Sequence, residues 1–216
     1  MTRMTFGVAA VLLGAGYAQG ALVLTLGNTY TGTAPAGSAP WATATFTQNG
    51  TNMVRLTLQS NLSGTEFLSN VLFNLDPAQS GVSGALNSGL SMGVFAAPDI
   101  DIGQNQYSAG GGAQYDIRLA FATAPPGMRF GGTDKAVIDF TGTGLTESDF
   151  NFFAVPGGGG LTFRAAAHVQ GIGPSGSDSG WIGDGPIIPL PPAAYPGAAC
   201  LLGVAGVSLA RRRMRN

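Results

Sequence analysis

The chain has 216 residues, among them 35 glycines and 13 prolines, and its formal net charge is −1. It contains a single cysteine, so no disulfide within the chain is expected. The segment from residue 21 to residue 188 holds eleven acidic and five basic side chains, which gives it a net charge of −6. This charge opposes contact with phosphates, so nucleic acid is not an expected partner. A chain of this length can form a hydrophobic core large enough to stabilise one domain without disulfide bonds.

The first 20 residues have the pattern of a secretory signal peptide. Arg3 supplies a basic start, and residues 6–18 form a short apolar segment. Small residues follow, and cleavage is expected after Ala18 or after Gly20. The apolar segment is too short to be a permanent membrane-spanning helix. We therefore expect the chain that follows to be exported.

From residue 21 onward apolar and polar residues alternate with a period of two, and helical patterns are nearly absent. Strands are expected at residues 22–26, 41–48, 54–59, 67–75, 115–121, 136–140 and 161–169. Asn49 and Gly50 predict a two-residue hairpin turn. Residues 67–75 are apolar on both faces, which is typical of a central strand. Residues 21–170 are thus predicted to form an all-β domain, an antiparallel β-sandwich of jelly-roll-like or immunoglobulin-like type.

Three segments interrupt the alternation. Residues 78–112 are rich in Gly, Ser, Ala and Asn and are interpreted as a binding loop or an irregular edge. Thr146 and Asp149 have the spacing of a capping pair, which predicts a short helix through Phe153. Residues 171–188 are rich in Gly, Ser and Pro and are predicted to be a flexible tether.

Two aromatic side chains are candidates for ligand binding. His168, the only histidine, lies on the polar face of the last expected strand. It is either a hydrogen-bonded strand residue or a ligand-binding or catalytic group, although no G-x-S-x-G motif surrounds a serine. Trp181 lies in the expected tether, and it either packs back onto the sandwich or stacks on a sugar.

Asp99, Asp101 and Asn105 form the best candidate for a metal site. Alternating carboxylates followed by glycine and asparagine supply the hard oxygen ligands that calcium prefers. The segment lacks the glycine and the glutamate that an EF-hand loop places at its sixth and twelfth positions, and a solvated acidic turn is the alternative. We therefore expect no metal and no other cofactor.

The end of the chain has three parts in sequence. A proline-rich segment is followed by an uncharged apolar run at residues 193–210, and the basic cluster comprises Arg211, Arg212, Arg213 and Arg215. As a helix the apolar run is about 27 Å long, which just spans a hydrocarbon core of about 30 Å. The arginines favour the cytoplasmic side, so residues 21–188 are expected to lie beyond the inner membrane.

This order resembles the PEP-CTERM sorting signal of Gram-negative bacterial surface proteins. The usual motif begins Val-Pro-Glu-Pro, and the matching positions here are Ile188, Pro189, Leu190 and Pro191. The resemblance covers residues 186–216 and implies cleavage by an exosortase-like membrane protease. The sorting motif would then comprise Pro189, Leu190, Pro191, Pro192 and Ala193. A plain C-terminal anchor behind a proline-rich linker is the alternative.

These features predict an exported protein that is first anchored in the inner membrane and then reaches the cell surface or the extracellular matrix. A non-enzymatic structural or adhesive role is expected. The alternative is a carbohydrate-binding module of the exopolysaccharide matrix that uses Trp41 or Trp181 and the glycine-rich loop. A secreted hydrolase is the third interpretation.

Overall fold

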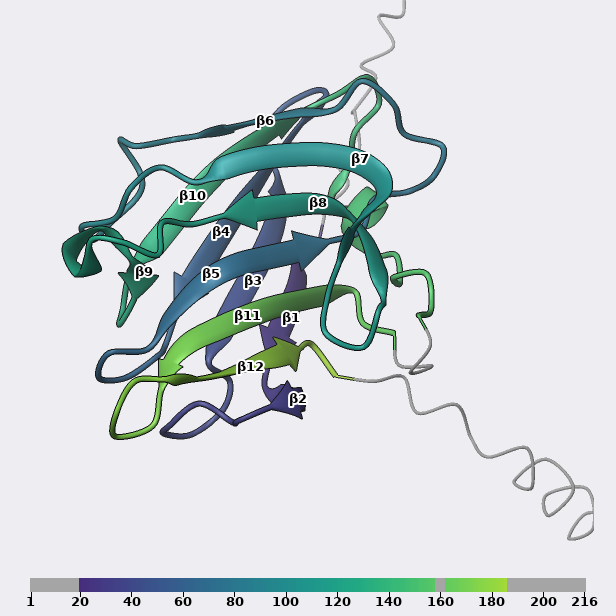
Figure 1. The fold of residues 1–216 in the computed structure, drawn as a ribbon. Helices are drawn as coiled ribbons and strands as arrows, with labels where there is room; N and C mark the ends of the chain where they lie inside the picture. The colour runs from purple at the N-terminus through teal and green to yellow at the C-terminus, as the bar shows by residue number, and fades with distance from the viewer. Residues whose placement is uncertain (1–19, 158–161, 186–216) are drawn as a thin grey trace, which may run out of the picture.

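The computed structural model describes residues 20–157 and 162–185, and this part of the chain is all-β with two short 3-10 helices (Figure 1). Except for Gly20, the predicted signal peptide lies outside the described residues. The sorting motif, the apolar run and the arginine cluster lie outside them as well. Among the described residues no helix is long and apolar enough to cross a membrane.

The strands form two antiparallel sheets, which confirms the all-β prediction and is consistent with a β-sandwich. Sheet A contains, in spatial order, β1 (Leu22–Leu26), β3 (Ala42–Gln48), β4 (Met53–Ser60), β10 (Lys135–Thr141) and β6 (Ser83–Leu86). Sheet B contains β2 (Asn28–Gly32), β12 (Asp178–Gly183), β11 (Ala165–Ile172), β5 (Phe67–Phe73), β8 (Gln114–Ala120) and β7 (Asp99–Ser108). The short strand β9 (Phe130–Gly131) also pairs with β5.

The main core lies between the sheets and is built by the predicted alternation. Alternate residues of β3 and β4 are fully buried, and the apolar ones are Ala42, Ala44, Phe46, Val54, Leu56 and Leu58. The ring of Phe46 stacks on Phe150 with centroids 4.4 Å apart and meets Phe73 edge-on at 5.2 Å. Such pairs contribute about 0.5–1.5 kcal/mol beyond the area that they bury. β5 is buried on both faces, as expected for a central strand.

Two local predictions are confirmed in type but not in length. Residues 42–48 and 53–60 do form a hairpin, but residues 49–52 separate the strands, with Gly50 and Asn52 at φ 111° and 62°. The predicted capping pair is present, since the N–H of Thr146 donates to Asp149 Oδ2 at 2.8 Å. The helix it starts is a single 3-10 turn, η2 (Glu147–Phe150).

Two segments expected to be irregular contain strands. Residues 78–112 include β6 and β7, which are edge strands of the two sheets, and the pairing of β7 is interrupted between Ile102 and Tyr107. Of the two interpretations of this segment, the irregular edge therefore describes it, and it is not one long loop. Residues 171–188 include β12, which pairs with both β11 and β2, so these residues are not a tether through their whole length. The glycines of β12 serve close packing instead of flexibility. A side chain at Gly180 would collide with the backbone of Thr33, beside β2.

Candidate functional site

The hairpin that joins β7 to β8 folds over the outer face of sheet B, and we call residues 103–114 the hairpin arm. In Figure 1 the arm passes in front of β11 toward β12. Ala109 and Ala113 of the arm pack with Leu72, Tyr115 and Ala166 in a second, smaller hydrophobic cluster. At the arm's tip, a Cβ on Gly110 would lie 2.6 Å from Cδ1 of Trp181. The outer face of sheet B is therefore partly covered.

One carboxylate fixes the base of the arm. Asp116 accepts hydrogen bonds from the backbone N–H groups of Asn105 at 2.7 Å and Leu75 at 2.9 Å. Asn105 adopts a left-handed φ of 51° inside the irregular segment where the pairing of β7 and β8 is interrupted. Gly111 and Gly112 have φ values of 88° and 86°, which the turn at the tip requires. The arm thus has a definite geometry.

A hollow of about 180 Å³ lies between the arm and the sheet. Its lining combines two aromatic rings, two carboxamides, a hydroxyl, a leucine and a guanidinium, contributed by Asn70, Leu72, Gln106, Tyr107, Ser108, Arg118 and Trp181. These residues come from β5, β7, β8 and β12, so strands far apart in the sequence build one site. Aromatic walls beside carboxamide, hydroxyl and guanidinium groups can contact both the apolar and the polar parts of a small ligand.

Trp181 and His168 lie together beside this hollow. They are directly opposite on β12 and β11, and their rings stack with centroids 4.8 Å apart and an angle of 17°. The Nδ1 atom of His168 lies 3.0 Å from Ser69 Oγ. Burial lowers the pKa of His168 below its ordinary value of 6.5, so the ring is neutral at pH 7.

This geometry shows how both residues are packed. His168 is a hydrogen-bonded strand residue. Trp181 packs back onto the sandwich, because His168 covers one face of its ring. Trp181 still lines the hollow, but as part of a wall and not as an isolated exposed platform. Trp41, the other aromatic candidate, is 8 % exposed and its Nε1–H donates to the carbonyl of Ala36.

Arg118 and Asp101 form an ion pair at the opposite end of the hollow. Both Nε and Nη2 of Arg118 donate to Asp101 Oδ2, at 3.0 and 2.8 Å. The guanidinium also lies over the ring of Tyr107, 5.1 Å from its centroid. The sequence predicted a strand at residues 115–121, which contains Arg118, but nothing in it connected Arg118 with Tyr107, in a segment interpreted as a binding loop or an irregular edge.

The calcium candidate has a different structure from the expected acidic turn. Asp99, Asp101 and Asn105 lie along β7, so the loop on which that interpretation depended is not there. The carboxylate of Asp101 is bound by Arg118, and Asp99 is exposed opposite Ala120. Within residues 20–157 and 162–185, no group of three or more His, Cys, Asp or Glu side chains is placed to hold a metal ion.

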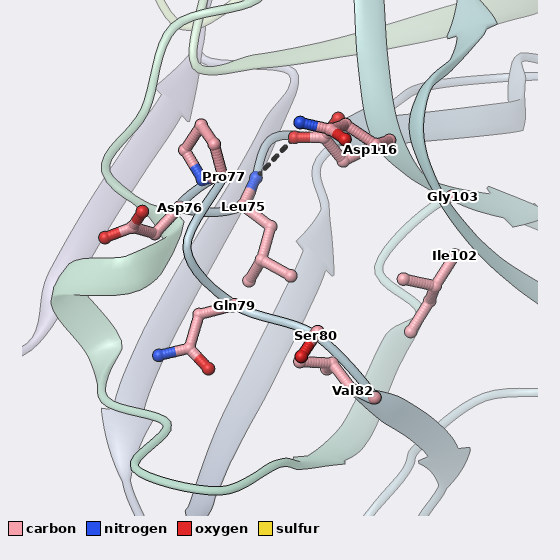
Figure 2. Close-up of a pocket in the computed structure, with 11 residues that line it drawn as sticks. Leu75, Asp76, Pro77, Gln79, Ser80, Val82, Ile102, Gly103 and Asp116 are labelled. Atoms are coloured by element: carbon pink, nitrogen blue, oxygen red, sulfur yellow. Dashed lines mark hydrogen bonds between the residues drawn. The ribbon is translucent and has the colours of Figure 1, made fainter.

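A second hollow, of about 320 Å³, lies between residues 75–82 and β7 (Figure 2). Leu75, Val82 and Ile102 form its apolar part. Both oxygens of Asp116 are already used by backbone N–H groups, and Gln79 donates to Asp149 Oδ2 at 3.1 Å. Asp116 and Gln79 therefore serve the fold, and the hollow under the arm, which has two aromatic walls, is the better candidate site.

No family model matches the chain, and comparison with curated proteins and with solved structures gives no match.

Proposed function

We propose that this is an exported cell-surface protein whose β-sandwich attaches to polysaccharide through the hollow under the hairpin arm. The observation that carries the proposal is the convergence of Trp181, Tyr107, Arg118 and Asn70 on one hollow. Sugars present apolar C–H faces and a rim of hydroxyls, so aromatic walls and placed donors and acceptors are the groups that suit them. An adhesive role in an exopolysaccharide matrix follows from such binding.

Hydrolysis is the weaker interpretation of the same region. A Ser-His pair is present, because Ser69 Oγ lies 3.0 Å from Nδ1 of His168. Ser69, however, is only 3 % exposed, whereas a nucleophile must reach the bond that it attacks. This burial favours binding without turnover.

The sequence signals at both ends support the location. A signal peptide at residues 1–20 would export the chain, and β12 ends only a few residues before the proline-rich motif. We infer that an exosortase-like protease cuts this motif after transient anchoring in the inner membrane. Within the β-sandwich class we favour a jelly-roll-like type, because the chain crosses between the sheets repeatedly, as in β1–β2–β3 and β4–β5–β6.

Affinity electrophoresis tests the binding proposal directly. The purified protein should be retarded in gels that contain a polysaccharide from a panel of neutral and acidic polymers. Trp181→Ala and Tyr107→Ala should each lose most of this retardation, because each removes a wall of the hollow. Thr45→Ala on the outer face of sheet A is the matched control and should migrate like the wild type. Retardation by no polymer, or equal retardation of all variants, would refute the proposal.

Mass spectrometry of the protein isolated from the native cell surface tests the sorting proposal separately. Processing should leave a C-terminus between Pro191 and Ala194. Recovery of a chain that still ends at Asn216 would show that the tail is an uncleaved anchor.

A further inference from the structure

We infer that the polysaccharide bound under the hairpin arm is a neutral one, and that the Arg118–Asp101 ion pair excludes acidic polymers. This inference rests on the proposed function and adds the chemical class of the ligand. It starts from the charges around the hollow. Of the described residues that line it, Arg118 alone carries a charge.

That charge is already compensated. Asp101 Oδ2 accepts from both Nε and Nη2 of Arg118, so two donors of the guanidinium are occupied. A sugar carboxylate would have to displace Asp101 or approach beside it, and either way two like charges would meet. Neutral hydroxyls face no such conflict, because they can accept from the remaining Arg118 donors and donate to the other Asp101 oxygen.

The surroundings reinforce this selection. Strand register aligns Trp181, His168, Asn70, Ala120 and Asp99 across five neighbouring strands of sheet B. The row therefore ends at the exposed Asp99 carboxylate, next to Asp101 on the same face of β7. The ring of His168 is neutral at pH 7, so it adds no positive charge to the row. An acidic polymer laid along this row would meet the Asp99 carboxylate and the Arg118–Asp101 pair, and none of the five residues of the row carries a positive charge at pH 7.

Neighbouring strands lie about 4.8 Å apart, so the row is about 19 Å long. A polymer that crosses the strands can therefore contact the face over several sugar units. This extended contact favours binding to an internal stretch of the polysaccharide over binding to its end.

The test compares neutral polymers (dextran, a mixed-linkage glucan and a galactomannan) with acidic ones (polygalacturonate, alginate and hyaluronate). The wild type should bind at least one neutral polymer. Its affinity should change less than about twofold between about 20 and 300 mM salt, because a neutral polymer forms no ion pair with the protein. Binding to acidic polymers should be at least about tenfold weaker.

Asp101→Asn provides the decisive variant, because it uncovers Arg118 while keeping the size of the side chain. Its affinity for an acidic polymer should rise about tenfold at low salt and fall again at high salt. The double variant Asp101→Asn with Arg118→Gln should lose that gain, which separates the charge effect from any loosening of β7. Circular dichroism and thermal unfolding establish that each variant is folded.

The outcomes separate the two proposals. Failure of the wild type to bind any polymer would refute the proposed function itself. Tight, salt-sensitive binding of the wild type to an acidic polymer would leave polysaccharide binding intact but overturn the neutral class. An Asp101→Asn variant that is folded yet gains nothing for acidic polymers would likewise overturn the role of the ion pair.

Discussion

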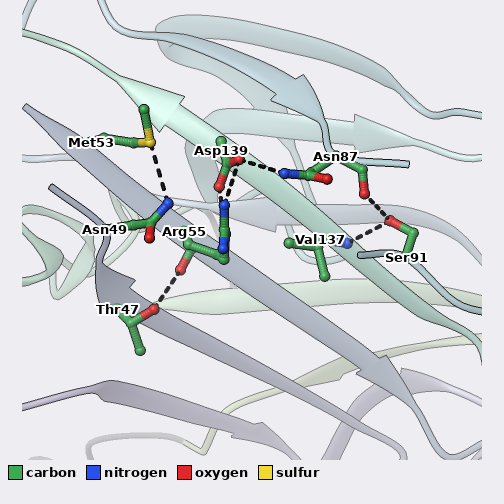
Figure 3. Close-up of polar contacts among 8 residues, drawn as sticks. All are labelled: Thr47, Asn49, Met53, Arg55, Asn87, Ser91, Val137 and Asp139. Carbon is green, nitrogen blue, oxygen red and sulfur yellow. Dashed lines mark hydrogen bonds and ion pairs between the residues drawn. The ribbon is translucent and has the colours of Figure 1, made fainter. Parts of the chain in front are cut away.

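The outer faces of the two sheets differ in polarity and in exposure to solvent. On sheet A the outward residues of β3 are Thr43, Thr45 and Thr47. The charged pair Arg55–Asp139 lies beside Thr47 (Figure 3). On sheet B the outward side chains include Leu72 and Tyr115, and the hairpin arm covers them. A polar face needs no cover, whereas an apolar face needs one, and the candidate site lies where that cover ends.

On the solvated face of sheet A, the charged side chains pair with one another within the protein. Arg55 donates to both oxygens of Asp139, at 2.7 and 2.9 Å, and Asn87 donates to the same carboxylate at 3.0 Å. Both oxygens of the Asp139 carboxylate are thus occupied by donors within the protein. Under the arm, by contrast, Arg118 uses only one oxygen of Asp101, which leaves polar capacity for a ligand.

The largest loss of stability is expected from substitutions of Tyr115, which is fully buried in the second cluster, beneath the hairpin arm. Tyr115→Ala should lower the free energy of unfolding by about 3–5 kcal/mol and release the arm, as measured by urea denaturation. Tyr115→Phe should instead raise it by about 1 kcal/mol, because within the described residues the buried hydroxyl has no hydrogen-bond partner. Equal losses in both variants would show that the hydroxyl, not the ring, holds the arm.

A smaller effect is expected where the arm touches Trp181. Gly110→Ala adds a Cβ 2.5 Å from Thr31 Oγ1 and 2.6 Å from Trp181 Cδ1, so the tip must move. We expect a loss of about 1–3 kcal/mol in unfolding free energy and a loss of polysaccharide retardation. Gly127→Ala is the control, since nothing lies within 4 Å of its added Cβ. If Gly110→Ala matches this control, the arm is not packed on Trp181.

The smallest effect concerns the ion pair on sheet A. Hydrogen bonding from Arg55 lowers the pKa of Asp139 below its ordinary value of 3.8. The resulting stabilisation is complete above that value and is lost as the pH falls through the lowered pKa. Arg55→Gln should therefore reduce the unfolding free energy by about 1 kcal/mol at pH 6 and by less at acidic pH. Urea denaturation between about pH 3 and 6 measures this, and a deficit that grows on acidification would contradict it.

Much of the sandwich could be predicted because one face of sheet A is exposed to solvent, so that polar and apolar residues alternate along its strands. Thr43, Thr45 and Thr47 alternate with buried residues, and such alternation determines both the strand and its inward face. β12 was missed because Gly180 and Gly183 have the composition of a linker, although their lack of side chains permits close packing. Residues 173–177 form the turn between β11 and β12, and their Gly-Pro-Ser-Gly-Ser sequence was the signal that a hairpin begins there.

The candidate site was predictable only in part. His168 and Trp181 were both singled out, but their stacking depends on the β11–β12 register, which the assumed tether concealed. Tyr107 and Arg118 meet because the arm folds back over sheet B, and no local pattern specifies that fold-back. Burial of β5 on both faces was the available hint, since it implies that something covers the outer face of sheet B.

Chemical-shift mapping of the isotope-labelled protein, titrated with an oligosaccharide of the neutral polymer that it binds, tests the central claim most directly. We predict that the shifts move at Asn70, Tyr107, Arg118 and the indole N–H of Trp181, while those of Thr45 and Arg55 on sheet A stay in place. Shifts confined to sheet A, or the absence of any saturable change, would contradict binding under the hairpin arm.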